Sequence, residues 1–191
     1  MIDWSEYFAT QIEMVDTQHK KLFDLLNDLS ESYNKNGASE KLVDDALGRL
    51  VAYADKHFLE EEELMLNSKV DPRHVKVHRM EHKSFIYDVN NMLTYSSTQN
   101  DTLALTEKLV SFITSWLTYH ILGTDHIMAL QIFAIQHGAS SEKAYELHNK
   151  VEYNAVVTRL MLASVLDLWR TSAERCHKLE EKLAALSDNR N

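Results

Sequence analysis

Hydrophobic residues recur every three or four positions along four long stretches of the chain, which is the spacing of amphipathic helices. We expect the first helix at about 17–35, with Asp16 or Thr17 as its N-terminal cap. Its inward positions are Leu22, Leu25, Leu26 and Leu29. We expect the second helix at about 40–66, capped by Ser39. Its inward positions are Leu42, Val43, Leu47, Leu50, Val51 and Ala54.

The third helix is predicted at about 73–95, directly after the helix-breaking Pro72, and the fourth at about 102–135. The segments between the helices are short and polar, and the fourth helix would end before Gly138. Four long helices with short connections predict an all-α fold, an up-down-up-down four-helix bundle.

A different hydrophobic period occupies the last part of the chain. The apolar positions there lie alternately three and four residues apart: Leu162, Val165, Trp169, Ser172 (the polar exception), Cys176, Leu179, Leu183 and Leu186. This 3.5-residue period is typical of a coiled coil, so we predict a long C-terminal helix that forms a parallel homodimer. A fifth helix folded back onto the bundle is the alternative. The pattern divides the chain into a bundle domain, 1–136, and a helical extension, 137–191.

Composition agrees with a helical fold and narrows the function. Four glycines and one proline in 191 residues are too few for the turns of a β-sandwich or for a glycine-rich phosphate loop. The net charge of −9 disfavours nucleic-acid binding. No apolar run approaches the ~18 residues of a membrane span, and no signal-peptide pattern is present. With Cys176 as its single cysteine, the chain has no internal disulfide, and we expect a cytoplasmic location.

Histidines and carboxylates lie among the inward residues of the predicted helices. The candidate metal ligands are His19, His57, Glu61, His78, His82, His120 and Asp125. His57 and Glu61 are four residues apart, as are His78 and His82, so each pair lies on one helix face and can reach a single centre. Buried without partners, such groups cost roughly 1–3 kcal/mol each, whereas a metal would satisfy them together.

The donor types narrow the choice of metal. Five imidazoles and two carboxylates without a thiolate fit a first-row transition ion rather than Ca²⁺ or Mg²⁺. Seven ligands are too many for one tetrahedral zinc and suit two metals with shared carboxylates, for which iron is the natural candidate. A ferritin-like di-iron oxidase would need Glu-x-x-His on two helices. The single match, Glu174 to His177, lies in the C-terminal segment.

Other histidines and glutamates have no place in this pattern. We expect Glu60, Glu62 and Glu63 to form a solvated acidic face. The remaining histidines are expected to be ordinary surface or core residues: His74, His126, His137, His148 and His177.

Four segments that carry the candidate ligands resemble bacterial hemerythrin in order and spacing. They are Val15–Phe23, His57–Met65, His78–His82 and Trp116–Asp125. The resemblance covers about residues 1–136 and implies a pair of iron ions. It implies that one iron is held by His78, His82 and His120.

The resemblance also implies that His19 and His57 hold the second iron, and that this ion keeps an open position for O₂. Glu61 and Asp125 would bridge both ions, together with an oxo or hydroxo group. The apolar wall of the O₂ pocket would consist of Trp116, Leu117 and Ile121. One placement does not follow from regular helix geometry, because His120 and Asp125 are five residues apart and point about 140° apart around an α-helix.

These features favour a non-haem di-iron, O₂-binding domain that acts as an oxygen or redox sensor. Similar bacterial arrangements join such a domain to a diguanylate cyclase (GGDEF) or chemotaxis module, and the C-terminal helix would lead to such an output domain outside this chain. A stand-alone oxygen carrier or store is the alternative. A di-iron oxidase or peroxidase is disfavoured, because the ligands nearly saturate the metals and the predicted pocket wall offers no acid or base. We expect no enzyme activity and no nucleic-acid or membrane partner for this chain.

Overall fold

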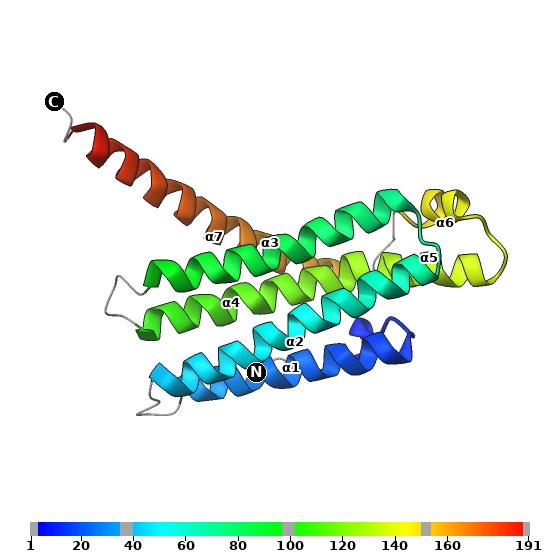
Figure 1. Cartoon of the computed structure of the whole chain (residues 1–191), viewed down its shortest axis with the longest axis horizontal. Helices are drawn as coiled ribbons and strands as arrows, with labels where there is room; N and C mark the ends of the chain where they lie inside the picture. The colour runs from blue at the N-terminus through cyan, green and yellow to red at the C-terminus, as the bar shows by residue number, and fades with distance from the viewer. Residues whose placement is uncertain (1–3, 35–39, 97–101, 150–153, 189–191) are drawn as a thin grey trace.

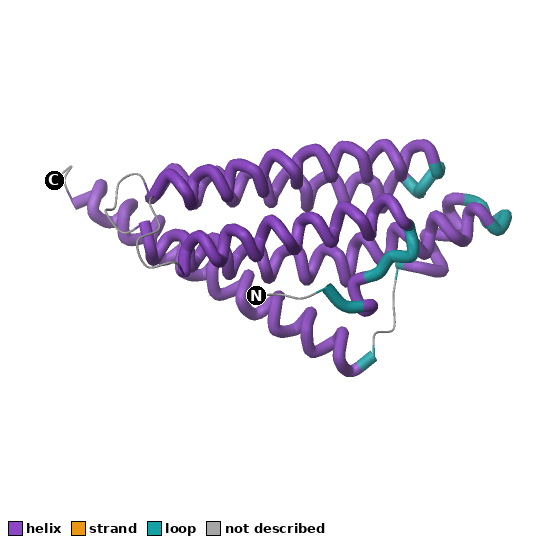
Figure 2. Tube along the Cα trace, turned by 90° about the horizontal axis from the view of Figure 1, so that it is seen from below, coloured by secondary structure: helices purple, strands orange, loops and turns teal. Residues whose placement is uncertain are grey.

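Four long helices lie side by side in alternating directions in a computed structural model, which describes residues 4–34, 40–96, 102–149 and 154–188 (Figures 1 and 2). They are α1 (Glu13–Asn34), α2 (Glu40–Asn67), α3 (Pro72–Ser96) and α4 (Thr102–His120). α1 and α3 each contact both α2 and α4, which closes the bundle. The predicted all-α, up-down-up-down bundle is confirmed.

Five further elements complete the described part of the chain: four lie toward one end of the bundle and the last packs along its side (Figure 1). They are a short 3₁₀ helix η1 (Glu6–Phe8), a π-helical segment η2 (Ile121–Asp125), α5 (His126–Gln136), α6 (Ser141–His148) and the long α7 (Ala155–Asp188). α4, η2 and α5 follow one another without a break, so the helix predicted at 102–135 exists but contains an expanded π turn. α6 was not predicted from the sequence, and its cap Ser140 accepts a hydrogen bond from the backbone N–H of Lys143.

α1 begins earlier than predicted, at Glu13, so the proposed cap at Asp16 or Thr17 is wrong. Asp16 lies inside the first turn and stabilises the loop before it. Its Oδ1 accepts hydrogen bonds from the backbone N–H and the hydroxyl of Thr10, both at 2.7 Å. Leu42 is a second correction, because it is exposed in the first turn of α2 while the neighbouring Val43 is buried.

Two hydrophobic clusters fill the bundle, one on each side of a buried polar layer. The larger includes Leu22, Phe58, Phe85 and Trp116, and the smaller consists of Val15, Met65, Val70, Val75, Met128 and Ile132. The helices α1, α2 and α3 and the continuous α4–η2–α5 helix therefore each run from one cluster to the other. The candidate ligands lie in the polar layer between the two clusters. Within the described residues, no helix combines the length and apolar character needed to cross a bilayer.

α7 packs obliquely along α4, touches η2 and then rises away from the bundle (Figures 1 and 2). Its contact face carries Val157 and Ser164, which are buried, and Met161 and Leu168, which are partly buried. The hydroxyls of Ser111 and Ser115 on α4 donate to Asp167 of α7 at 2.8 and 2.9 Å. The fifth-helix alternative is therefore correct for the first half of α7.

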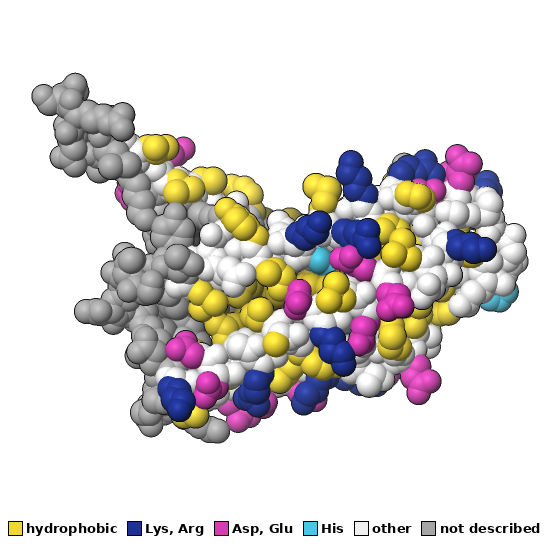
Figure 3. All heavy atoms as spheres, in the orientation of Figure 1, with side chains coloured by type: hydrophobic (Ala, Val, Ile, Leu, Met, Phe, Trp, Pro, Cys, Tyr) yellow, Lys and Arg dark blue, Asp and Glu magenta, His cyan; other side chains and the backbone are white. Residues whose placement is uncertain are grey.

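The 3.5-residue seam nevertheless stays exposed, because it lies on a different face of α7 from the one that packs on α4. Its exposed large side chains are Leu162, Val165, Trp169, Leu179 and Leu183. Figure 3 shows hydrophobic side chains along the part of α7 that rises from the bundle. α7 thus has two apolar stripes, and among the residues that the structure describes only one of them packs against the bundle.

Candidate metal centre

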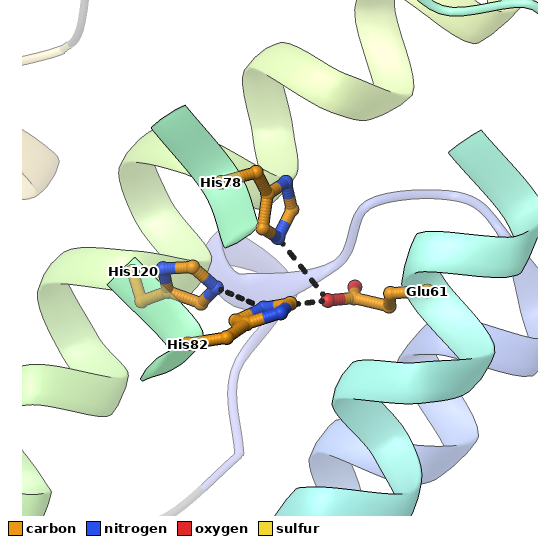
Figure 4. Close-up of side chains that lie close together, drawn as sticks. All are labelled: Glu61, His78, His82 and His120. Atoms are coloured by element: carbon orange, nitrogen blue, oxygen red, sulfur yellow. Dashed lines mark hydrogen bonds and ion pairs between the residues drawn. The ribbon is translucent and has the colours of Figure 1, made fainter. Parts of the chain in front are cut away.

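The seven candidate ligands come together in the buried polar layer. α1 contributes His19, α2 contributes His57 and Glu61, α3 contributes His78 and His82, α4 ends at His120, and η2 ends at Asp125. Every one of them is at most 2% exposed. Figure 4 shows Glu61 facing His78 and His82, with His120 beside His82. Helices far apart in sequence thus deliver all seven side chains to one place.

Glu61 reaches histidines from three helices. Its Oε2 lies 3.3 Å from Nε2 of His78 and 3.5 Å from Nε2 of His82 on α3. The same oxygen lies 3.6 Å from Nε2 of His57, one helical turn away on α2. Its other oxygen, Oε1, lies 3.9 Å from Nε2 of His19. One carboxylate therefore faces histidines of both predicted iron sites.

Asp125 spans both sites in the same way. Its Oδ1 lies 3.2 Å from Nε2 of His78 and 3.2 Å from Nε2 of His120, whereas its Oδ2 lies 3.2 Å from Nε2 of His19. The donor atoms form two groups within 4.8 Å, one of Glu61, His78, His82 and His120 and the other of His19, His57 and Glu61. Two groups that share a carboxylate have the layout of a two-metal site.

The π turn explains how His120 and Asp125 reach the same centre. The backbone N–H of His126 donates to the carbonyl of Ile121, an i→i+5 hydrogen bond. A π turn holds one residue more than an α turn, so residues five apart lie on nearly the same face. The position that regular helix geometry could not explain is therefore produced by the expanded turn.

The carboxylates and imidazoles of this centre shift one another's protonation. Burial raises the pKa of Asp125, but the charge of His120 and the ion-pair contacts with His19 and His78 outweigh it and hold the pKa well below its usual range. Burial lowers the pKa of His78, but the close contacts of its Nε2 with the carboxylates of Asp125 and Glu61 raise it to about 10. In the metal-free protein, the raised pKa of His78 thus favours an imidazolium beside the two carboxylates.

Several central atoms have no hydrogen-bond partner within the described part of the chain. They are Nε2 of His19 and His78 and both carboxylate oxygens of Glu61 and Asp125. Buried polar atoms without partners are costly, and these face one another across a shared centre. Imidazole nitrogens and carboxylate oxygens are suitable ligands for iron, so the residues fit a pair of iron ions.

Comparison with known proteins supports this interpretation. Residues 10–132 match the family described as the hemerythrin HHE cation binding domain. The chain belongs to the hemerythrin family. The match includes all seven residues of the centre, and the bundle that holds them is the hemerythrin domain.

Relatives of this hemerythrin domain occur in bacteria and eukaryotes. A bacteriohemerythrin of Clostridium acetobutylicum is 28% identical over 127 residues, 65% of this chain and 96% of that protein. A myohemerythrin of Theromyzon tessulatum is 29% identical over 122 residues, 64% of this chain and 86% of the relative. A hemerythrin-like protein of Naegleria gruberi is 30% identical over 123 residues, which are 64% of this chain and 87% of that protein. The search of solved structures found no match.

The outer nitrogens of four of the histidines in the hemerythrin centre contact polar side chains. Nδ1 of His57 lies 2.8 Å from Oε1 of Gln18, Nδ1 of His120 lies 2.8 Å from Oε2 of Glu81, and Nδ1 of His82 lies 3.4 Å from Oε1 of Glu62. Nδ1 of His78 lies 3.4 Å from Nε2 of His74. A proton held on Nδ1 leaves the lone pair of Nε2 free for a metal, and such partners orient the ring.

These outer partners were not predicted from the sequence. Glu62 was expected on a solvated face, but its side chain is 17% exposed and also accepts a hydrogen bond from Arg79 at 2.7 Å. Glu60 accepts a hydrogen bond from Gln18, whereas Glu63 is exposed as expected. The acidic-face prediction is wrong for Glu62, whereas the Glu60 side chain is still 36% exposed. The available signals were that Glu62 directly follows the ligand Glu61 and that Glu60 lies one turn from His57, but the sequence does not show which helix packs against these positions.

Aromatic rings hold two of the histidines in the hemerythrin centre. Phe58 stacks on His82 with ring centroids 4.0 Å apart, and Trp116 stacks on His120 at 4.3 Å. Trp116, Leu117 and Ile121, the residues assigned to the O₂ pocket, are all buried in the larger hydrophobic cluster. Trp116 lies against the three-histidine side of the centre, so its role in a pocket on the two-histidine side stays a prediction.

Proposed function

We propose that this chain is a non-haem di-iron, O₂-binding domain that senses oxygen or redox state. The convergence of five Nε2 atoms on two shared carboxylates is the observation that carries the di-iron centre. His78, His82 and His120 would hold one iron. The other would be held by His19 and His57, with Glu61 and Asp125 bridging. Two iron ions bound there would supply reversible binding of O₂ by exchanging electrons with it.

The chain's own residues would supply a dry site for this chemistry. The iron held by His19 and His57 would have two imidazole ligands, whereas the other iron would have three. The open coordination position for O₂ would therefore be on the iron with two imidazoles. Leu117 and Ile121 are 2% and 0% exposed and would exclude water from bound O₂. Neither side chain is an acid or a base, which favours binding over an oxidase or peroxidase reaction.

The contact between η2 and α7 supports a sensor rather than a simple carrier. Gly123 lies in η2, two residues before Asp125, and a Cβ atom built on it would meet Cε of Met161 on α7 at 3.3 Å. The absence of a side chain at Gly123 thus lets α7 approach the backbone that presents a bridging ligand. A shift of Asp125 between the two oxidation states would be transmitted directly to α7, and from there to a partner or further domain of the GGDEF or chemotaxis type.

Hydrogen exchange tests this coupling. We expect backbone amides at 155–172 to exchange at different rates in the diferrous and diferric proteins. Met161→Ala should abolish that difference while the iron stays bound, whereas Leu162→Ala, next to it on the exposed face, should preserve it. Identical exchange of the wild-type α7 in both states, with a long-lived and reversible oxygenated state, would instead favour the stand-alone carrier.

The exposed seam of α7 supports a parallel homodimer, with 1–136 as the bundle domain and 137–191 as the extension. Trp169 is 69% and Leu183 is 68% exposed, an unfavourable exposure for large apolar side chains at heptad positions. The stripe that packs on α4 would remain in place, so dimerisation requires no unfolding of α7 from its bundle.

Light scattering of the full chain, with Trp169→Glu as the variant, tests the dimer. We expect the wild type to be a dimer and the variant a monomer, whereas Leu59→Glu, a change at an equally exposed position on α2, should leave the dimer intact. A short bis-maleimide should cross-link two copies through Cys176 only if the helices are parallel and in register. A monomeric wild-type chain would contradict the proposal.

A further inference from the structure

One carboxylate outside the seven ligands holds both ends of the π turn. Oε2 of Glu81, on α3, lies 2.8 Å from Nδ1 of His120 and 2.8 Å from Oγ1 of Thr124. The His120 ring and the Thr124 hydroxyl both donate to this single oxygen. Glu81 immediately precedes the ligand His82, so α3 contributes two ligands and this clamp within five residues.

The π turn needs such support from elsewhere in the fold. π-helical turns are rare and occur mostly as single expanded turns within α-helices, so neighbouring contacts must favour them over a regular helix. His120 is the last residue before η2 and Thr124 is its fourth residue. Bonds to both from one oxygen on a separate helix fix the span of this turn, and Asp125 follows directly.

The ionised carboxylate suits this role better than a neutral amide would. Two donors share its oxygen, and hydrogen bonds to a charged acceptor are about twice as strong as neutral ones. The Glu81 side chain is 24% exposed and the His120 side chain 1%, so the clamp reaches from the edge of the bundle to the centre. Glu62 makes the comparable contact to His82 but touches no residue of η2 in any interaction found for it.

We propose that Glu81 is a positioning residue that stabilises the π turn and thereby places His120 and Asp125 for metal binding. This inference rests on the proposed di-iron function for its metal readout. The stability of the π turn itself can be measured by hydrogen exchange without metal.

Two measurements on the whole 191-residue chain test the role of Glu81. The first is amide hydrogen exchange of residues 121–126 in the metal-free protein. The second is the rate at which the iron-loaded, reduced protein gives up iron to ferrozine. The variants are Glu81→Ala, Glu81→Gln, Thr124→Val and Thr124→Ser, with Glu62→Ala as the matched control that removes a carboxylate from another ligand histidine.

We expect Glu81→Ala to speed exchange at 121–126 at least tenfold and iron release by about 10–100-fold, the usual effect of losing a partner behind a ligand. Glu81→Gln and Thr124→Val should have smaller effects of the same kind, and Thr124→Ser should behave as wild type. Glu62→Ala should speed iron release without changing exchange at 121–126.

Wild-type rates in Glu81→Ala, or equal exchange at 121–126 in Glu81→Ala and Glu62→Ala, would overturn the assignment. A wild-type protein that binds no iron would contradict the proposed function alone, because the exchange measurement on metal-free protein would still decide the role of Glu81.

Discussion

Replacing Glu61 with glutamine removes the charge of the shared carboxylate while keeping its size. Glu61 faces four histidine Nε2 atoms at 3.3–3.9 Å and is fully buried. Removing one partner from a buried charged cluster costs about 3–5 kcal/mol. At about 1.4 kcal/mol per factor of ten, Glu61→Gln should weaken retention of the metal pair by about 10²–10⁴-fold. Glu63→Gln, two residues along α2 and exposed, should have no measurable effect.

Metal analysis after dialysis against a chelator, together with near-ultraviolet absorption of the oxo-bridged pair, measures this loss. Circular dichroism of both variants shows whether the bundle remains folded. If folded Glu61→Gln protein retained two irons with the absorption of the wild type, the assignment of this carboxylate to both ions would be refuted.

Three further perturbations probe the packing and the protonation of the centre. Leu117→Ala should cost about 2–5 kcal/mol of stability and shorten the lifetime of the oxygenated state, as measured by thermal unfolding and stopped-flow mixing with O₂. Phe58→Leu should lose the stacking on His82, worth about 0.5–1.5 kcal/mol, and speed iron release to a chelator. The metal-free protein should gain stability from pH 4 to 6.5, because burial lowers the pKa of His57 to about 4 and the unfolded chain binds more protons there. The metal-free protein should lose stability from pH 6.5 towards 10. Burial lowers the pKa of His78, but Asp125 and Glu61 raise it to about 10, so His78 keeps its proton in this range only in the folded chain. Urea unfolding from pH 4 to 10 checks both slopes.

The bundle and its ligand pairs were predictable because they depend on helical periodicity alone. Residues four apart share a face in any regular helix, so His57 with Glu61 and His78 with His82 could be paired from their spacing. The pairing of His120 with Asp125 could not be obtained in this way, because it depends on a π turn. Spacing along the chain does not reveal where a helix expands.

Contacts between helices were the other limit on prediction. Glu81 and Gln18 meet their histidines across helix boundaries, at positions set by the rotation and offset of neighbouring helices. The C-terminal helix shows the same limit, since its seam could be recognised from spacing but the second stripe, with Val157 and Ser164, could not be assigned to α4. The fold-back alternative is therefore correct for the first half of this helix, whereas the homodimer through its exposed seam stays a prediction.

The metal content of the purified 191-residue chain tests the central claim most directly. We expect two iron ions per chain and, in the oxidised protein, near-ultraviolet absorption from an oxo-bridged pair, because seven buried ligands converge on a centre with two donor groups. One zinc ion per chain, without that absorption, would contradict the di-iron assignment.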